Sequence, residues 1–288
     1  MIAFDFAEPA TLREAIGLLD PDDPTVRPIA GGTALMLMMK AGVFAPTRLV
    51  SLQNVEPQYS AIKVDGGALT IGALATLSSL ERSKEVAAAF PVISRTMVRL
   101  SNPRVRNVAR VGGALAHGDP HMDLPPLLAA LGARATLMGP NGSREIAVEE
   151  LYTGYYETVI ARDELITSVS VPALQGRKAA YVKVTSRTAD DWPALGIAVV
   201  LASEGDKLTD IRLVASAATA MVTRLPAAEA ILKGKRADDA TLKQAGDAAA
   251  GEAPLLEDAH GSIAYKRELM RVYIGRSIRQ ALSGTPTH

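Results

Sequence analysis

The chain has 288 residues, 48% of them hydrophobic and 22% charged, which is typical of a globular protein with one large or two smaller domains. Its 31 basic and 31 acidic side chains balance, so no overall field favours nucleic acid or an anionic membrane as a partner. The lack of cysteine excludes disulfides, thiolate zinc sites and Cys-ligated iron–sulfur clusters on this chain.

The first part of the sequence predicts short helices and strands. Thr11 to Glu14 has the form of a capping box, so a helix is expected to begin there and to end near Asp20. Further elements are expected, in order, as a strand at 27–30, a helix at 33–41, a strand at 47–52, a hairpin at 62–71 and helices at 76–82 and 86–100, with Pro91 near a helix start. A helix at 124–131, a hairpin at 134–148 and a strand at 165–171 follow.

The second part reads as strands and then helices. A polar, glycine-bearing segment at 172–178 is interpreted as a linker, which predicts domains at 1–175, with subdomains at about 1–55 and 56–175, and at 176–288. Three strands are expected at 180–186, 195–202 and 208–217, and helices from Pro226 to a long one at 262–282. This order predicts an α+β domain with helices on one face of a three-stranded antiparallel sheet.

Two glycine runs stand out, at 29–33 (Ile-Ala-Gly-Gly-Thr) and 110–114 (Arg-Val-Gly-Gly-Ala). Glycine permits positive φ and lets bare amides approach an anion, so the pair can form a phosphate cradle, although each run can also be an ordinary turn. The regular βαβ alternation and the Gly-x-Gly-x-x-Gly motif of nicotinamide-binding domains are missing, so we expect another nucleotide cofactor.

Several spaced motifs carry a family resemblance. They are Arg27-Pro-Ile-Ala-Gly-Gly-Thr-Ala-Leu35, Leu69-Thr-Ile-Gly-Ala73, the stretch from Arg106 through Val-Gly-Gly-Ala-Leu-Ala-His-Gly-Asp to Pro120 with Asp123, Asp163-Glu-Leu-Ile166, and Tyr181-Val-Lys-Val-Thr-Ser-Arg187. Together they resemble the FAD-binding medium subunit of molybdenum hydroxylases, the family of carbon monoxide and xanthine dehydrogenases. The resemblance implies a two-subdomain FAD-binding fold of the vanillyl-alcohol oxidase (PCMH) type, followed by a smaller α+β C-terminal domain.

The resemblance also implies a function. FAD on this chain would receive electrons from two [2Fe-2S] clusters of a small subunit, which are fed by a molybdopterin-type cofactor on a large subunit, and pass them to quinone, NAD or oxygen. A dimer of heterotrimers is expected. Because no apolar run is long enough to span a membrane and no signal peptide is evident, we expect a cytoplasmic complex, with contact to the inner face of the membrane left open. Two alternatives stay open: a self-sufficient FAD oxidoreductase and a non-redox nucleotide-binding assembly protein.

By resemblance, the backbone of the two glycine runs holds the FAD diphosphate, Thr33 adds a hydroxyl, and Leu35, Leu100 and Ile166 line the ring. Lys183 reaches the flavin from the second domain, and Asp123 accepts hydrogen bonds from the ribityl or ribose hydroxyls of the flavin nucleotide. The full expected set of FAD-binding residues is Arg27, Ile29, Ala30, Gly31, Gly32, Thr33, Ala34, Leu35, Leu100, Arg110, Val111, Gly112, Gly113, Ala114, His117, Asp123, Ile166 and Lys183. No catalytic residue is expected.

Some of these positions also have plain structural readings. Arg27 can be a solvated arginine, Leu100 a core leucine, Asp123 a helix N-cap, and Lys183 an exposed charge on a strand. Arg110 departs from the family, which commonly has a threonine or serine there; its guanidinium can replace the missing hydroxyl contact to phosphate.

Two further clusters invite functional readings. The segment from His117 to Asp123 alternates imidazole and carboxylate like a set of metal ligands, but the family has a similar stretch without metal, and we expect none. Exposed aromatic residues can gate an acceptor site, and the candidates are Tyr152, Tyr155, Tyr156 and Trp192, each of which can equally have a core or interface role.

Overall fold

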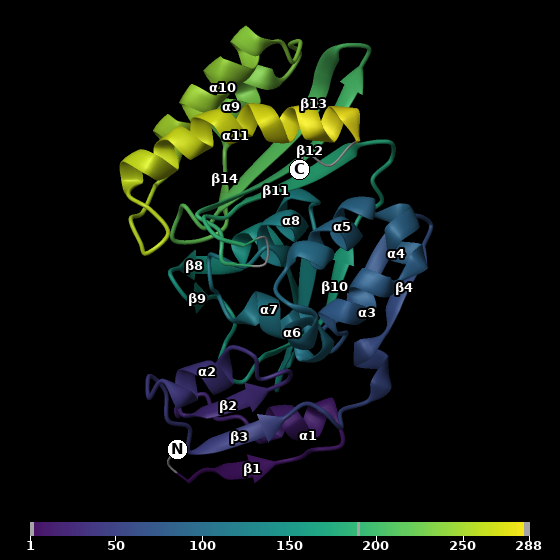
Figure 1. The fold of residues 1–288 in the computed structure, drawn as a ribbon. Coiled ribbons are helices and arrows are strands. Elements are labelled where there is room, and N and C mark those ends of the chain that lie inside the picture. Colours follow the sequence, from purple (N-terminus) through teal and green to yellow (C-terminus); the bar gives the residue numbers. More distant parts are fainter. Residues whose placement is uncertain (1–2, 189–190, 285–288) are drawn as a thin grey trace.

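The computed structural model describes residues 3–188 and 191–284, which form three blocks in chain order (Figure 1). The first block is a parallel three-stranded sheet in the order β1-β3-β2, with two short helices. Its elements are β1 (Asp5–Ala7), α1 (Leu12–Gly17), β2 (Val26–Ile29), α2 (Leu35–Lys40) and β3 (Arg48–Ser51). The expected capping box starts α1, because the Thr11 hydroxyl accepts from the Glu14 amide and the Glu14 carboxylate accepts from the Thr11 amide.

The second block is an antiparallel five-stranded sheet in the order β4-β5-β10-β6-β7, covered by helices. Its strands are β4 (Ile62–Asp65), β5 (Ala68–Gly72), β6 (Arg134–Gly139), β7 (Gly142–Ala147) and β10 (Leu165–Val171), and a hairpin of β8 (Tyr152–Gly154) and β9 (Glu157–Thr158) lies beside them. Its helices are η1 (Pro57–Ser60), α3 (Leu77–Arg82), α4 (Lys84–Ala89), α5 (Pro91–Arg99), α6 (Pro103–Val108), α7 (Val111–Ala116), α8 (Leu124–Ala130) and η2 (Val148–Glu150).

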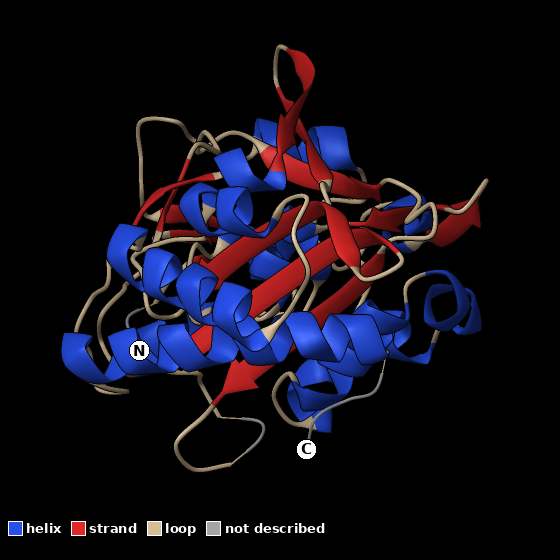
Figure 2. Cartoon of the chain, turned by 90° about the horizontal axis from the view of Figure 1, so that it is seen from above, coloured by secondary structure: helices blue, strands red, loops and turns tan. Residues whose placement is uncertain are grey.

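The third block is an antiparallel sheet in the order β11-β12-β13-β14, with three helices after it. Its strands are β11 (Lys178–Val184), β12 (Leu195–Glu204), β13 (Lys207–Ser216) and β14 (Thr223–Arg224), and its helices are α9 (Pro226–Leu232), α10 (Asp239–Glu252) and α11 (Ile263–Ser283). Seen from above, the helices lie across the strands (Figure 2). None of the helices in the described parts of the chain is long and apolar enough to cross a membrane.

Helix α8 joins the second and third blocks. All seven of its residues are buried, since it packs against β12 and β13 of the third block as well as against its own block. Alternate residues of β12 therefore enter different cores: Ala198 and Val200 belong to the core that contains α8, whereas Ile197 and Val199 belong to the core under α10 and α11. Burial on both faces explains the nearly continuous apolar sequence of this strand.

The α+β fold class is confirmed, and three details differ from expectation. The C-terminal sheet has a fourth strand, β14, which at two residues is too short to show an alternating pattern. Its helices cover one face as expected, but α8 covers the other, because an apolar helix with no polar face needs cover on all sides. The helical segment expected at 86–100 is divided at Phe90, where the backbone leaves the helical region, and Pro91 begins α5, which confirms the expected place of the proline at a helix start.

Candidate functional site

The first glycine run forms a loop between β2 and α2 whose amide groups are free. Gly32 has φ of +66°, which reverses the chain direction, and the five amides from Gly31 to Leu35 donate to no acceptor among the described residues. Consecutive free amides around a left-handed residue make an anion-binding concavity. The loop that the sequence singles out therefore offers hydrogen-bond donors to an acceptor that is not part of the chain.

The second run lies directly against the first. A Cβ added at Gly31 would lie 2.1 Å from the carbonyl oxygen of Val108 and 2.8 Å from Cα of Ala109, the residue just before Arg110. Only glycine permits this contact between the two backbones. Segments some eighty residues apart are thus brought together, as the sequence reading required.

Most of the amides in the second run are already used. Val111 donates to the carbonyl of Ala75 at 3.0 Å, Gly112 to that of Ala73 at 2.7 Å, and Ala114 to that of Arg110 at 2.9 Å. Gly113 differs: its amide has no acceptor in the described structure, and a Cβ added there would have no protein atom within 4 Å. Of the amides from Val111 to Ala114, all of which were expected to contact a phosphate, only that of Gly113 is free to do so within the described residues.

Basic side chains surround the two runs. Arg27 precedes the first run and is exposed; desolvation by the surrounding protein, with the charge of Arg162, lowers its pKa. His117, at the end of α7, is half-buried, and burial lowers its pKa, with Arg27 adding to the shift against the opposing charge of Asp119. Arg27 on β2 is thus near enough to His117 for its charge to disfavour protonation of the imidazole.

Arg110 is directed toward the protein. Its Nη1 donates to the carbonyl oxygen of Leu74 at 2.8 Å, and burial lowers its pKa. One arm of the guanidinium is therefore committed to the turn after β5. The remaining donors are what a phosphate contact would have to use.

Asp123 and Lys183 form a buried pair between the second and third blocks. The Asp123 carboxylate accepts from Lys183 Nζ at 2.9 Å and from the Tyr181 hydroxyl at 2.8 Å, and the side chains of the pair are 4% and 5% exposed. Burial raises the pKa of Asp123, against the opposing effect of the ammonium group. Lys183 is thus no exposed strand charge. Asp123 does stand at the N-cap position of α8, as the structural alternative expected, but its side chain makes no capping hydrogen bond to the helix.

The pair lines a cavity between α5 and β11. Its volume is about 260 Å³, and Arg95, Arg99 and Tyr181 also line it. Lys183 Nζ donates a second hydrogen bond, at 3.3 Å, to the carbonyl oxygen of Arg99 at the end of α5. Among the expected ring-lining residues, Leu100 follows directly and is 7% exposed, whereas Ile166 lies on β10 at 9% exposure; both belong to the main core.

The histidine–aspartate segment spreads its side chains to different partners. His121 Nδ1 contacts Asp119 Oδ1 at 3.0 Å and Nε2 contacts Asp258 Oδ2 at 2.9 Å, while Asp123 binds Lys183. Burial opposes protonation of His121, but the two carboxylates outweigh it and raise its pKa. In the described residues no group of three or more His, Asp or Glu side chains is placed to hold a metal ion.

The third block completes this network with residues that no sequence pattern indicated. Lys266 is fully buried and donates to Asp258 Oδ2 at 2.6 Å and to the carbonyl of Ala217 at 3.1 Å. The result is a chain of charges, Asp119–His121–Asp258–Lys266, that joins the α7–α8 loop to α11. Lys266 lies in the first turn of α11, and nothing in the sequence distinguishes it from the other charged residues of that helix.

The aromatic gate candidates separate by exposure. Tyr152 is 7% exposed and its hydroxyl is buried, so it is no gate at the surface. Trp192, Tyr155 and Tyr156 are 50%, 53% and 39% exposed. Trp192 stacks on His121 with ring centroids 5.9 Å apart, and Tyr156 meets His117 edge to face at 5.1 Å.

Comparison with known proteins accounts for both parts of the chain. The family model described as the FAD binding domain in molybdopterin dehydrogenase matches residues 2–174, and the CO dehydrogenase flavoprotein C-terminal domain matches residues 180–281. The chain belongs to this FAD-binding family of molybdopterin dehydrogenases. It is an FAD-dependent oxidoreductase subunit, as the resemblance in the sequence implied.

Individual relatives match over almost their whole length. The carbon monoxide dehydrogenase medium chain of Afipia carboxidovorans is 32% identical, with 97% of this chain and 96% of the relative covered, and the nicotine 6-hydroxylase medium subunit of Paenarthrobacter nicotinovorans is 30% identical, with 97% of each covered. The solved carbon monoxide dehydrogenase of Hydrogenophaga pseudoflava matches with a TM-score of 0.94 at 31% identity, over 99% of this chain and 100% of the other. Quinoline 2-oxidoreductase of Pseudomonas putida matches with a TM-score of 0.91 at 28% identity, over 98% of each chain.

Proposed function

We propose that this chain is the FAD-carrying electron-transfer subunit of a heteromeric molybdenum hydroxylase. The observation that carries the proposal is the meeting of the two glycine runs, where the amides of Gly31 to Leu35 and of Gly113 are free on a bare backbone. A diphosphate needs several hydrogen-bond donors at close approach, and this surface offers them without bulky side chains. The residues present therefore fit FAD.

The chain's residues divide the binding between two ends of the cofactor. The free amides and the cations of Arg27 and Arg110 would hold the diphosphate, and His117, neutral at pH 7 because its pKa is lowered, would offer a hydrogen bond instead of a charge. Asp123 and Lys183 would meet the flavin end, where the ammonium stabilises negative charge by Coulomb attraction. FAD, when bound, supplies the capacity to take electrons singly or in pairs.

The proposed partners are supported by the relatives, and the proposed acceptor by the family resemblance in the sequence. Their names describe medium chains and subunits of carbon monoxide dehydrogenase, nicotine 6-hydroxylase and glyceraldehyde dehydrogenase, which supports further subunits as partners. As the family resemblance implies, these would be a small iron–sulfur subunit and a large molybdenum subunit, in a dimer of heterotrimers. The molybdenum partner would choose the substrate. Quinone, NAD or oxygen would be the acceptor, and the exposed rings of Tyr155, Tyr156 and Trp192 are where it would dock.

The test is purification of the full chain through a tag from cells that express its neighbouring subunits. The proposal predicts co-purification of an iron–sulfur and a molybdenum subunit, and bleaching of the flavin when the substrate of the molybdenum subunit is added to the complex but not to this chain alone. Turnover of a substrate by the isolated chain would support a self-sufficient oxidoreductase instead. A chain that takes up no flavin would contradict both.

A further inference from the structure

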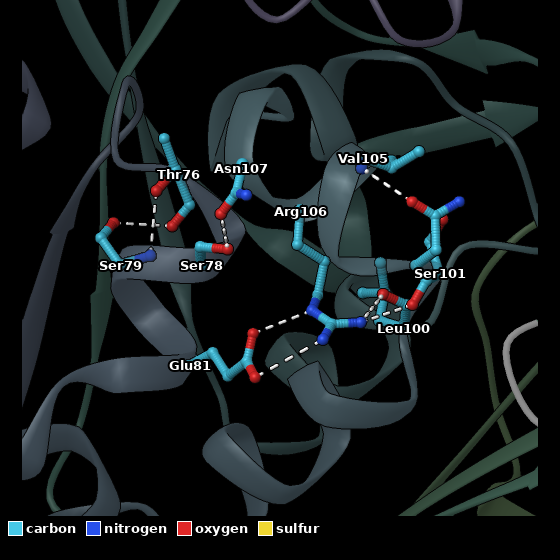
Figure 3. Close-up of polar contacts among 10 residues, drawn as sticks. Thr76, Ser78, Ser79, Glu81, Leu100, Ser101, Val105, Arg106 and Asn107 are labelled. Atoms are coloured by element: carbon cyan, nitrogen blue, oxygen red, sulfur yellow. Dashed lines mark hydrogen bonds and ion pairs between the residues drawn. The ribbon is translucent and has the colours of Figure 1, made fainter.

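A buried arginine holds the turn between α5 and α6 (Figure 3). Arg106 lies in α6 at 6% exposure, and its Nε donates to Glu81 Oε2 of α3 at 2.8 Å. On its other side Nη1 donates to the carbonyl oxygens of Leu100, at 3.3 Å, and Ser101. The planar guanidinium thus binds a carboxylate and two backbone carbonyls at once, a geometry that lysine cannot reproduce.

The turn that Arg106 holds is not a relaxed one. Ser101 has φ of +57°, in the left-handed region that residues with a Cβ rarely adopt. The next residue, Asn102, starts α6 by accepting from the Val105 amide at 3.1 Å. Without the guanidinium, the carbonyls of Leu100 and Ser101 would lose their donor and the strained turn would lose its support.

The same turn carries contacts to the candidate flavin site. The carbonyl of Arg99 accepts from Lys183 Nζ, and Lys183 in turn binds Asp123. Leu100, whose carbonyl Arg106 holds, is one of the expected ring-lining residues. A continuous path of contacts therefore runs from Glu81 through Arg106 and the turn to Lys183 and Asp123.

We propose that Arg106 is a positioning residue for the flavin site: by fixing the turn at 99–101 it fixes the Lys183 ammonium and the Leu100 side chain. This inference rests on the proposed function, because it assumes that FAD binds beside Lys183. A purely structural ion pair would contribute to the stability of the chain without changing any property of the flavin. A positioning residue must change a property of the flavin, and must do so through Lys183.

The test is a double-mutant cycle on the full chain, with the subunits that co-purify with it, in which the midpoint potential of the bound flavin and the dissociation constant of FAD are measured. Arg106→Lys keeps the charge beside Glu81 but loses the fork. We expect Arg106→Lys to weaken FAD binding roughly tenfold, because the displaced Lys183 ammonium loses one charge-assisted contact with the cofactor. We also expect a lower midpoint potential, because the displaced ammonium stabilises reduced flavin less. In a Lys183→Met background the same substitution should leave the potential unchanged.

Two further variants serve as controls. Arg212→Lys alters another half-buried pair, with Glu149 at 2.8 Å, and should leave the potential unchanged in both backgrounds. Glu81→Gln keeps an oxygen for Arg106 Nε, so it should fold even if Arg106→Lys does not, and should lower the potential by less.

Additive effects of Arg106→Lys and Lys183→Met, or a wild-type potential in the Arg106→Lys and Glu81→Gln chains, would overturn the positioning role. A wild-type chain without FAD would overturn the proposed function itself.

Discussion

Gly113 separates the binding role of the second glycine run from a structural one. In the Gly113→Ala variant the new Cβ meets no protein atom within 4 Å, and φ at this position is not in the left-handed region, so the chain itself has room for it. Alanine is the better residue in a helix, and Gly113 lies in α7, so without cofactor the variant should be as stable as the wild type or gain about 0.5–1 kcal/mol.

The same methyl group would stand where the diphosphate must approach the free amide. Loss of one charge-assisted hydrogen bond weakens binding by about 1.5–3 kcal/mol, which is roughly a tenfold to hundredfold rise in the dissociation constant of FAD. Titration of the cofactor-free chain with FAD, followed by flavin fluorescence, measures this change, and thermal unfolding of the same samples measures stability.

Gly251→Ala is the matched control, because Gly251 also lies in a helix, α10, with no atom within 4 Å of a built Cβ. It should leave FAD binding unchanged and stability equal or higher. If Gly113→Ala binds FAD as tightly as the control does, the open glycine has no phosphate beside it and the reasoning fails.

Three other outcomes follow from the structure. Lys183→Met should destabilise the chain by about 3–5 kcal/mol in urea unfolding, because the buried Asp123 carboxylate loses its cation, and adding Asp123→Asn should recover part of the loss. His121 has a raised pKa, so its contribution to stability is fully present below about pH 6.5 and is lost as pH rises through its higher folded value; His121→Gln should flatten this part of the stability profile. Trp192→Ala should cost less than about 1 kcal/mol, as the ring is half exposed, yet slow the reduction of the external acceptor in the assembled enzyme.

Each of these can fail in a distinct way. A Lys183→Met chain of wild-type stability would mean that Asp123 is protonated and needs no cation. An identical fall in stability with rising pH in wild type and His121→Gln would place the titrating group elsewhere. Unchanged acceptor kinetics in Trp192→Ala would remove the tryptophan from the acceptor site.

Local sequence signals sufficed where the physics is local. The capping box at Thr11 and the Asp65-Gly66 hairpin turn depend on neighbours in the chain, and both are present in the structure. The glycine runs were found for the same reason, because positive φ and close approach both demand glycine. That the two runs form one cradle was predicted from the glycines and supported by the family resemblance, whereas the contact of Gly31 with Val108 is seen only in the structure.

The rest depends on contacts between distant segments. The Gly112 amide donates to the carbonyl of Ala73, whereas the Gly113 amide does not. This difference depends on the end of β5, forty residues earlier in the chain. The distant partner of His121, Asp258, comes from the loop before α11, and Lys183 is buried where α5 packs against β11. In the sequence, Arg106 does not differ from other charged residues on short helices. Its burial and its role depend on contacts with the turn at Ser101, which only the structure shows.

The flavin content of the full-length chain tests the central claim most directly. Acid release of the cofactor, followed by identification and by comparison with the protein concentration, should give one FAD per chain, or one FAD taken up per chain when the purified protein is titrated with it. A chain that contains no flavin and shows no saturable uptake of FAD would contradict the account.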